Sequence, residues 1–233
     1  MPTSRSDEAP PPGWMRLVEA AYLVPRAVYG LGHLGPRGPE DGEPALVIPG
    51  FIANDRTTME LRRRLTAGGW RVHPWKAGWN LGARADTIER LKERLDAIDP
   101  ERRILLVGWS LGGVFARALA LAHPERVRAV VTLGSPFSGD PHSNNVWRLY
   151  EWIAGHPVDQ PPIERDTSKP PVPTLTIWSP DDGIVSPRAA RGLEEESDKV
   201  VALKCSHMAF GVSRKAAEQV VQEIDTFLKD VAD

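Results

Sequence analysis

Short apolar runs of β-forming residues alternate with amphipathic helical segments through most of this chain of 233 residues. Such alternation is typical of a parallel sheet covered by helices on both faces, because each pair of parallel strands needs a long crossover that is usually a helix. The six runs are Ala45 to Ile48, Arg71 to Trp75, Ile104 to Gly108, Val127 to Leu133, Pro173 to Trp178 and Val200 to Leu203. We therefore predict an α/β fold with a mostly parallel six-stranded sheet flanked by helices.

The intervals between these runs carry helix signals. Thr57 and Glu60 stand three positions apart and predict a capping box, and Gly68 predicts the end of that helix. Apolar residues at helical spacing predict a second helix over residues 88–98. The last helix is expected to begin after a Ser213 cap.

The first 44 residues precede the alternating pattern. Met1 to Pro12 is polar and rich in proline, so we expect a disordered start, and the pattern from Trp14 to about Gly30 predicts a helical extension. Residues 45–233 are then expected to form one domain, which is an ordinary size for a single α/β unit.

One segment inside that domain, Ser135 to Pro171, breaks the alternation. It lies where a crossover helix should be, and it holds seven prolines and one short helical pattern at Asn145 to Ala154. Long irregular segments in compact domains are often lids or binding loops. We expect a lid-like insertion here, and a simple surface excursion with one packed helix is the alternative.

Composition excludes several classes of protein. Lys and Arg number 29 against 31 Asp and Glu, so the net charge gives no sign of the basic face that a nucleic-acid-binding protein would carry. The single cysteine, Cys205, cannot form an internal disulfide, which fits a reducing compartment and a cytoplasmic location. The start lacks signal-peptide features, and charged residues and a proline interrupt the apolar stretch after Trp14, so we expect no transmembrane helix. Weak peripheral membrane contact through the N-terminal helix and the oligomeric state stay open.

The pattern Gly108-Trp109-Ser110-Leu111-Gly112 directly follows an apolar run and precedes a helical segment. A serine on a tight strand-to-helix turn projects its Oγ outward, and the next backbone N–H points toward a developing oxyanion. The two glycines remove Cβ atoms that would clash in such a turn. We therefore predict that Ser110 is a nucleophile.

A serine hydroxyl needs a base to activate it, and the base needs a carboxylate to orient it. His207 is the only one of the six histidines that lies in a loop after a predicted strand and before the final helix. Asp181 and Asp182 follow the preceding strand, so all these residues should meet at the carboxyl edge of the sheet. Local chemistry does not distinguish the two aspartates.

With these motifs the chain resembles the α/β-hydrolase superfamily, and within it the small bacterial serine lipases and esterases without a large cap domain. The resemblance covers residues 45–231 and includes the oxyanion loop Ile48-Pro49-Gly50-Phe51 and the turn Thr132-Leu133-Gly134. The family pattern Asp-x-x-Val selects Asp182, which precedes Val185. The resemblance also implies that the backbone N–H groups of Phe51 and Leu111 form the oxyanion hole. Pro49 departs from the usual histidine of that loop.

The resemblance implies an esterase or lipase that cleaves carboxylic esters through an acyl-enzyme intermediate, with Ser110, His207 and Asp182 as its triad and with no metal or other cofactor. A small-molecule or lipid-like ester, of medium chain length, is the expected substrate. Apolar residues near the motifs are candidates for binding it. They are Ile52, Trp109, Phe137 and Met208, with the further aromatics Trp79, Trp147, Tyr150 and Trp152.

Two alternatives to ester hydrolysis stay open. An acyltransferase would use the same triad with an alcohol or amine acceptor in place of water. A non-catalytic binding or scaffold protein on the same fold is the alternative from a different class.

Overall fold

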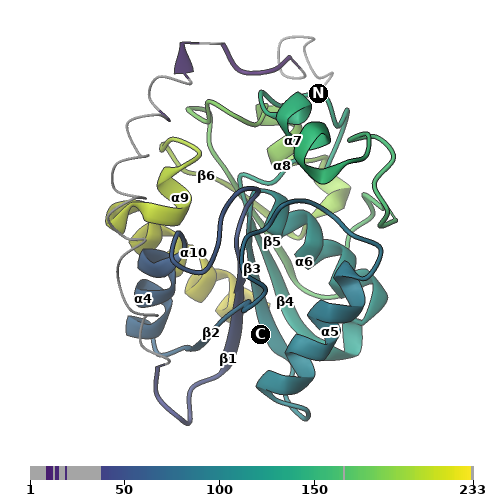
Figure 1. Ribbon diagram of the computed structural model, residues 1–233. Helices are drawn as coiled ribbons and strands as arrows, with labels where there is room; N and C mark the ends of the chain where they lie inside the picture. The colour runs from purple at the N-terminus through teal and green to yellow at the C-terminus, as the bar shows by residue number, and fades with distance from the viewer. Residues whose placement is uncertain (1–8, 13, 16–18, 20–37, 165, 232–233) are drawn as a thin grey trace.

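The computed structural model describes residues 9–12, 14–15, 19, 38–164 and 166–231. The described chain forms a parallel sheet of six strands in the order β2-β1-β3-β4-β5-β6 (Figure 1). The strands are β1 (Pro44–Ile48), β2 (Arg71–Pro74), β3 (Ile104–Trp109), β4 (Val127–Leu133), β5 (Thr174–Trp178) and β6 (Lys199–Ala202). The predicted fold class is confirmed, and each predicted strand overlaps an observed one.

The central strands are apolar along their whole length because both faces of the sheet are covered. Every residue of β1 and β3 is buried. Side chains of β3 alternate between the two faces, so that Leu105 and Val107 join one apolar cluster and Ile104 and Leu106 join the other.

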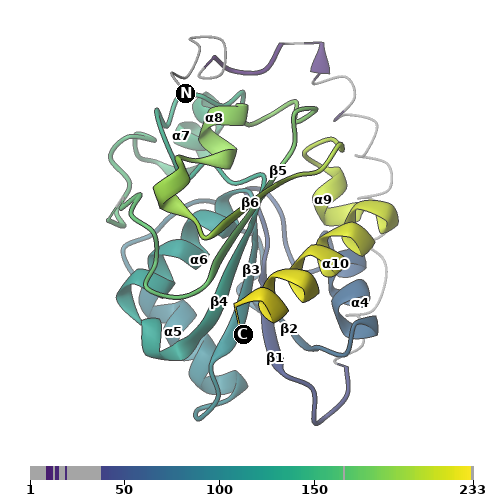
Figure 2. The same ribbon diagram turned by 180° about the vertical axis from the view of Figure 1, so that it is seen from behind.

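Helices form a layer on each side of the sheet (Figures 1 and 2). On one side α4 (Met59–Ala67) packs against α10 (Arg214–Asp230), with α9 (Ala209–Val212) beside them. On the other side lie α5 (Thr87–Ile98) and α6 (Leu111–Ala122). The shorter helices are α7 (Trp147–Ala154), α8 (Pro187–Arg191) and the 3-10 turns η1 (Pro124–Arg126) and η2 (Glu194–Glu196).

The strand order places a switch point in the middle of the sheet. The chain runs from β1 outward to β2, then returns to the other side of β1 as β3. The connection after β1 and the connection after β3 therefore run to opposite sides, which opens a crevice at the carboxyl ends of β1 and β3. Any ligand of a sheet with this order is expected to bind there.

Of the two N-terminal helix caps predicted from the sequence, the structure contains one. Ser213 caps α10 by accepting a hydrogen bond from the Ala216 N–H, as predicted. The capping box at Thr57 was wrong, because Thr57 lies one residue before the N-cap of α4. Its hydroxyl donates to the Asn54 carbonyl at 2.6 Å and closes the preceding turn, while Glu60 pairs with Arg64 at 2.8 Å.

Most of the predicted N-terminal helix, and residues 1–8 of the predicted disordered start, lie outside the described residues. Of the residues described in that region, Trp14 is exposed and Glu19 is only 5% exposed. No helix in the described ranges is both long enough and apolar enough to cross a bilayer.

The apolar face of α10 supplies a test of this architecture. Ile224 is fully buried against the sheet, so Ile224→Ala should lower the free energy of unfolding by about 2–5 kcal/mol through lost burial and the cavity left behind. Urea denaturation measures the change. The control Gln222→Ala alters an exposed position on the same helix and should stay within about 0.5 kcal/mol of wild type. Equal losses for the two variants would contradict the assignment of the buried face.

Candidate active site

Ser110 occupies a one-residue turn between β3 and α6, with φ 53° and ψ −123°. Such a conformation is strained for a residue with a Cβ and is kept only where neighbours fix it. The Ser110 N–H donates to the Leu133 carbonyl at 2.8 Å, which ties the turn to the end of β4. Gly112 lets α6 start directly over β1, because a Cβ there would lie 2.2 Å from the Ile48 carbonyl oxygen.

Asp182 and His207 form a buried pair, each only 2% exposed. His207 Nδ1 lies 2.7 Å from Asp182 Oδ2, while Asp182 Oδ1 accepts from the N–H groups of Ile184 and Val185, both at 2.8 Å. The backbone N–H of Val185, three positions after the aspartate, therefore helps to orient the carboxylate. Asp181 is exposed, and its backbone N–H donates to Ser179.

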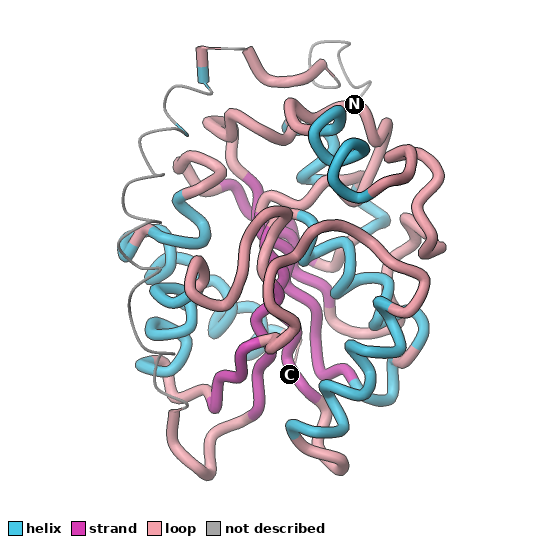
Figure 3. The backbone as a smooth tube through the Cα atoms, viewed as in Figure 1, coloured by secondary structure: helices cyan, strands magenta, loops and turns pink. Residues whose placement is uncertain are grey.

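The pair lies against the turn that carries Ser110 (Figure 3 shows the loops gathered beyond the strand ends). A Cβ at Gly134 would lie 3.0 Å from Asp182 Oδ2 and 3.2 Å from His207 Nδ1, and Gly134 is the residue after the carbonyl that binds Ser110. Trp109, the residue before the serine, also contacts the base loop, because its Nε1 donates to the His207 carbonyl at 3.2 Å. The Asp182–His207 pair and the Ser110 turn thus lie at the same carboxyl edge of the sheet.

Charge around His207 favours its protonated form. Burial lowers the pKa of the imidazole, but the carboxylates of Asp182 and Glu19 outweigh burial, so the pKa of His207 lies above its ordinary value. The hydrogen bond from Nδ1 to Asp182 leaves Nε2 as the nitrogen that can accept a proton.

The loop after β1 lies beside Ser110. A Cβ at Gly50 would lie 3.0 Å from the Ser110 Cβ, which places the Phe51 backbone next to the serine. Ile52 has a φ of 51°, and its N–H donates to the Asn80 carbonyl at 2.7 Å. The Asn80 side chain is buried and donates to the Pro49 carbonyl at 2.8 Å. This bond holds the loop in place, although Pro49 stands where the resembled family usually has a histidine.

The N–H groups of Phe51 and Leu111 are the predicted oxyanion donors. Leu111 is the first residue of α6, where backbone N–H groups have no partner inside the helix and the helix dipole is positive. Within the described ranges, the hydrogen bonds formed include none donated by the N–H of Phe51 or Leu111. This arrangement can bind a developing negative charge beside Ser110.

An apolar cavity of about 100 Å³ lies next to Ser110, and residues of the 135–171 segment form part of its lining. Its lining includes Phe51, Leu111, Val114, Phe115, Pro136, Pro141, Val146, Trp147, Tyr150, Val158, Pro161, Ile163 and Val185. Most of these residues come from the segment, whose short helix forms as α7 (Trp147–Ala154) close to the predicted 145–154. The cavity fits a small apolar group attached to a carbonyl.

A larger cavity of about 500 Å³ lies between the 75–84 loop, α5 and α7, and Trp79 lines it. Its lining does not include Ser110, Asp182 or His207. The smaller cavity is therefore the one that can hold a reacting group.

The structure places the predicted binding residues away from the smaller cavity. Trp109 and Met208 are buried in the core cluster on the α10 side, and Phe137 is buried with the Arg117 guanidinium 4.1 Å from its ring centroid. Ile52 is half-buried and does not line the cavity. Of the further aromatics, Trp147 and Tyr150 line it and Trp152 is 81% exposed.

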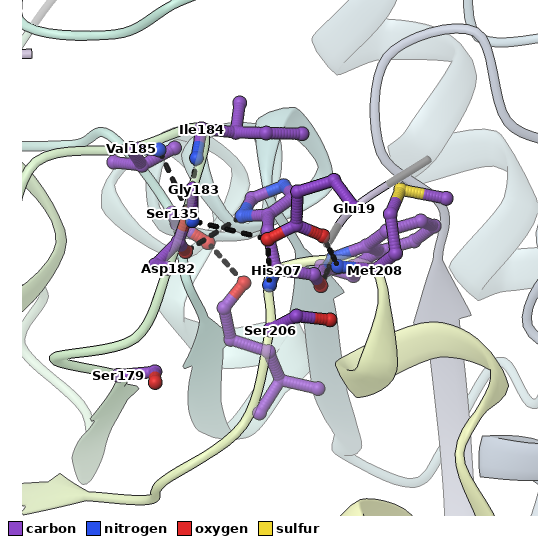
Figure 4. Close-up of polar contacts among 12 residues, drawn as sticks. Glu19, Ser135, Ser179, Asp182, Gly183, Ile184, Val185, Ser206, His207 and Met208 are labelled. Atoms are coloured by element: carbon purple, nitrogen blue, oxygen red, sulfur yellow. Dashed lines mark hydrogen bonds and ion pairs between the residues drawn. The ribbon is translucent and has the colours of Figure 1, made fainter. Parts of the chain in front are cut away.

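Sequence reasoning missed Glu19, which it treated only as a charge that interrupts an apolar stretch. The Glu19 carboxylate contacts the backbone of both the Asp182 loop and the His207 loop (Figure 4). An acidic residue among apolar ones was the only signal, and a signal of that kind does not identify a partner.

Comparison with known proteins agrees with this architecture. Residues 73–154 match a family described as the alpha/beta hydrolase fold. Over 58 residues the chain is 45% identical to the pimeloyl acyl-carrier-protein methyl ester esterase of Salmonella heidelberg, a region that is 25% of this chain and 22% of that enzyme. The match thus covers less than a quarter of the length of that enzyme.

Solved structures are similar over most of the chain. A bacterial membrane phospholipase A has a TM-score of 0.62 at 18% identity, with 94% of this chain and 92% of that chain covered. A lipase-esterase related protein from Clostridium acetobutylicum has a TM-score of 0.62 at 16% identity, with coverages of 82% and 96%. The family match and the architecture together confirm that this chain has the α/β-hydrolase fold.

Proposed function

We propose that this protein hydrolyses carboxylic esters, with Ser110 as nucleophile, His207 as general base and Asp182 as the carboxylate that orients it. The observation that carries the proposal is the buried 2.7 Å contact between His207 and Asp182 beside the strained turn at Ser110. A buried His–Asp pair beside a serine on a strained turn is the arrangement expected for nucleophilic catalysis. A histidine with a purely structural role would not require a strained serine next to it.

The mechanism follows from these positions. Ser110 Oγ attacks the ester carbonyl carbon while His207 Nε2 takes its proton, and Asp182 stabilises the imidazolium. The N–H groups of Phe51 and Leu111 bind the oxyanion. His207 then protonates the leaving alcohol, which yields an acyl-Ser110. Water attacks this acyl-enzyme with His207 again as base, and release of the carboxylic acid restores the serine.

The substrate class follows from the cavity. Its lining is largely apolar and its volume is about 100 Å³, which favours esters whose acyl group is short to medium in length. We propose that the 135–171 segment is the cover of the site, since its residues line one wall of that cavity.

Ester hydrolysis should depend on Ser110. Wild-type protein should hydrolyse p-nitrophenyl esters, and Ser110→Ala should lower kcat by a factor of about 10⁴ or more, because alanine has no hydroxyl that could form the acyl-enzyme. Release of p-nitrophenol gives the rate, and thermal unfolding confirms that the variant is folded. Equal rates for the two proteins would rule out Ser110 as the nucleophile.

Variants of the two neighbouring aspartates, Asp181 and Asp182, test which carboxylate orients His207. Asp182→Asn should lower kcat by on the order of 10⁴-fold, the loss known for the same change in serine proteases. It also removes a charge that raises the pKa of His207, so the acid limb of the kcat/KM profile should move to lower pH. Asp181→Asn changes an exposed residue and should keep most of the activity. A larger loss at Asp181 than at Asp182 would overturn this assignment.

Enlarging a side chain of the cavity wall tests whether the cavity binds the acyl chain of the ester. Val114 lies on the first turn of α6 and lines the cavity, so Val114→Phe should fill part of it. The ratio of kcat/KM for octanoate over acetate esters should then fall about tenfold, since steric exclusion acts on the longer chain first. Acetate hydrolysis serves as the internal control. An unchanged ratio would show that acyl chains bind elsewhere.

A further inference from the structure

We infer that Glu19 is a positioning residue, which holds the acid loop and the base loop together from the N-terminal segment. The inference rests on the proposed function, since it assigns Glu19 a role toward the Asp182–His207 pair. Glu19 lies 163 residues before Asp182 in sequence, so it belongs to neither loop.

The Glu19 carboxylate joins two loops through their backbones (Figure 4). Its Oε1 accepts from the Gly183 N–H at 3.0 Å and from the His207 N–H at 2.7 Å. Its Oε2 accepts from the Met208 N–H at 2.8 Å. One donor follows Asp182 directly and the other two are His207 itself and its successor, so movement of either loop stretches a bond to the same carboxylate.

A carboxylate suits this place better than any other side chain. All three N–H donors are buried, and an ionised carboxylate offers acceptor sites on both oxygens. A glutamine of the same shape has one oxygen and one NH₂ group, and the NH₂ group cannot accept from an N–H. In either orientation of the amide, at least one donor would lose its partner.

The acid loop is shaped to receive the N-terminal segment. A Cβ at Gly183 would lie 2.8 Å from the Met15 carbonyl oxygen and 3.0 Å from Glu19 Cγ, so glycine permits the close approach. Asn145 adds a second attachment, because its Nδ2 donates to the carbonyls of both Pro11 and Gly183. The N-terminal segment is thus joined to the acid loop and to the 135–171 segment.

Glu19 also acts on His207 through charge. The charged groups that shift the imidazole are Asp182, from the loop after β5, and Glu19, from the N-terminal segment, and both raise the pKa of His207. Removing the Glu19 charge should therefore move the acid limb of the kcat/KM profile to lower pH. Glu19 does not line the cavity, so KM should change little while kcat falls.

The test compares Glu19→Gln with the control Glu101→Gln, which neutralises an exposed acid in the turn before β3. Glu19→Gln should lower kcat about 10- to 100-fold, as expected when catalytic groups lose their alignment, and should shift the acid limb to lower pH. Glu101→Gln should match wild type in both. A folded Glu19→Gln protein with wild-type kcat and pH profile would overturn the inference.

Gly183→Ala is a second variant, which tests the positioning role of Glu19 even if Glu19→Gln does not fold. The added methyl group should push the N-terminal segment away without altering a triad side chain, and kcat should fall with KM nearly constant. Wild-type kcat in a folded Gly183→Ala protein would contradict the inference.

An NMR titration of the His207 imidazole separates this inference from the proposed function. It reports the pKa whether or not esters are hydrolysed, and the pKa should be lower in Glu19→Gln than in wild type. An unchanged pKa would overturn the role of Glu19 alone. Absence of Ser110-dependent ester hydrolysis in wild type would instead overturn the proposed function.

Discussion

The backbone turn at Ser110 is the constraint around which the carboxyl edge of the sheet is arranged. A non-glycine residue with positive φ costs on the order of 1–3 kcal/mol, so the surrounding structure must fix it. Here β4 holds the serine through the Leu133 carbonyl, and α6 lies so close to β1 that position 112 must be glycine. The position of Ser110 therefore depends on three adjacent strands, and any change that separates β1, β3 and β4 also releases the turn.

Buried charge is the second organising interaction. Two carboxylates, Asp182 and Glu19, lie beside His207 with little access to water. Burial of a carboxylate is tolerated where hydrogen-bond donors replace water, and both carboxylates use backbone N–H groups of the loops after β5 and β6. The same bonds that satisfy the charges also fix the loops, so the electrostatics and the geometry of the pair cannot be varied separately.

Two segments without regular β/α alternation complete the site, and they do so differently. The 135–171 segment contributes side chains to the wall of the cavity, so it bears on which group fits beside Ser110. The N-terminal segment contacts the two loops that carry the pair through Glu19, and it approaches Gly183 closely. Neither is part of the sheet, and each reaches the carboxyl edge only because the strands end there together.

Local sequence determined the elements and the candidate chemistry of this protein, because hydrophobic periodicity and short motifs depend on neighbouring residues. The six strands, the tight turn at Ser110 and the placement of His207 in the loop after β6 could be predicted in this way. Tertiary structure decided what depends on distant residues. It paired His207 with Asp182, the aspartate that the family pattern selects and local chemistry does not. It also buried Trp109 and Phe137, which were expected to bind substrate, and joined Glu19 to both loops. Adjacent aspartates and scattered aromatic side chains have the same local chemistry, and only packing against remote segments makes them different.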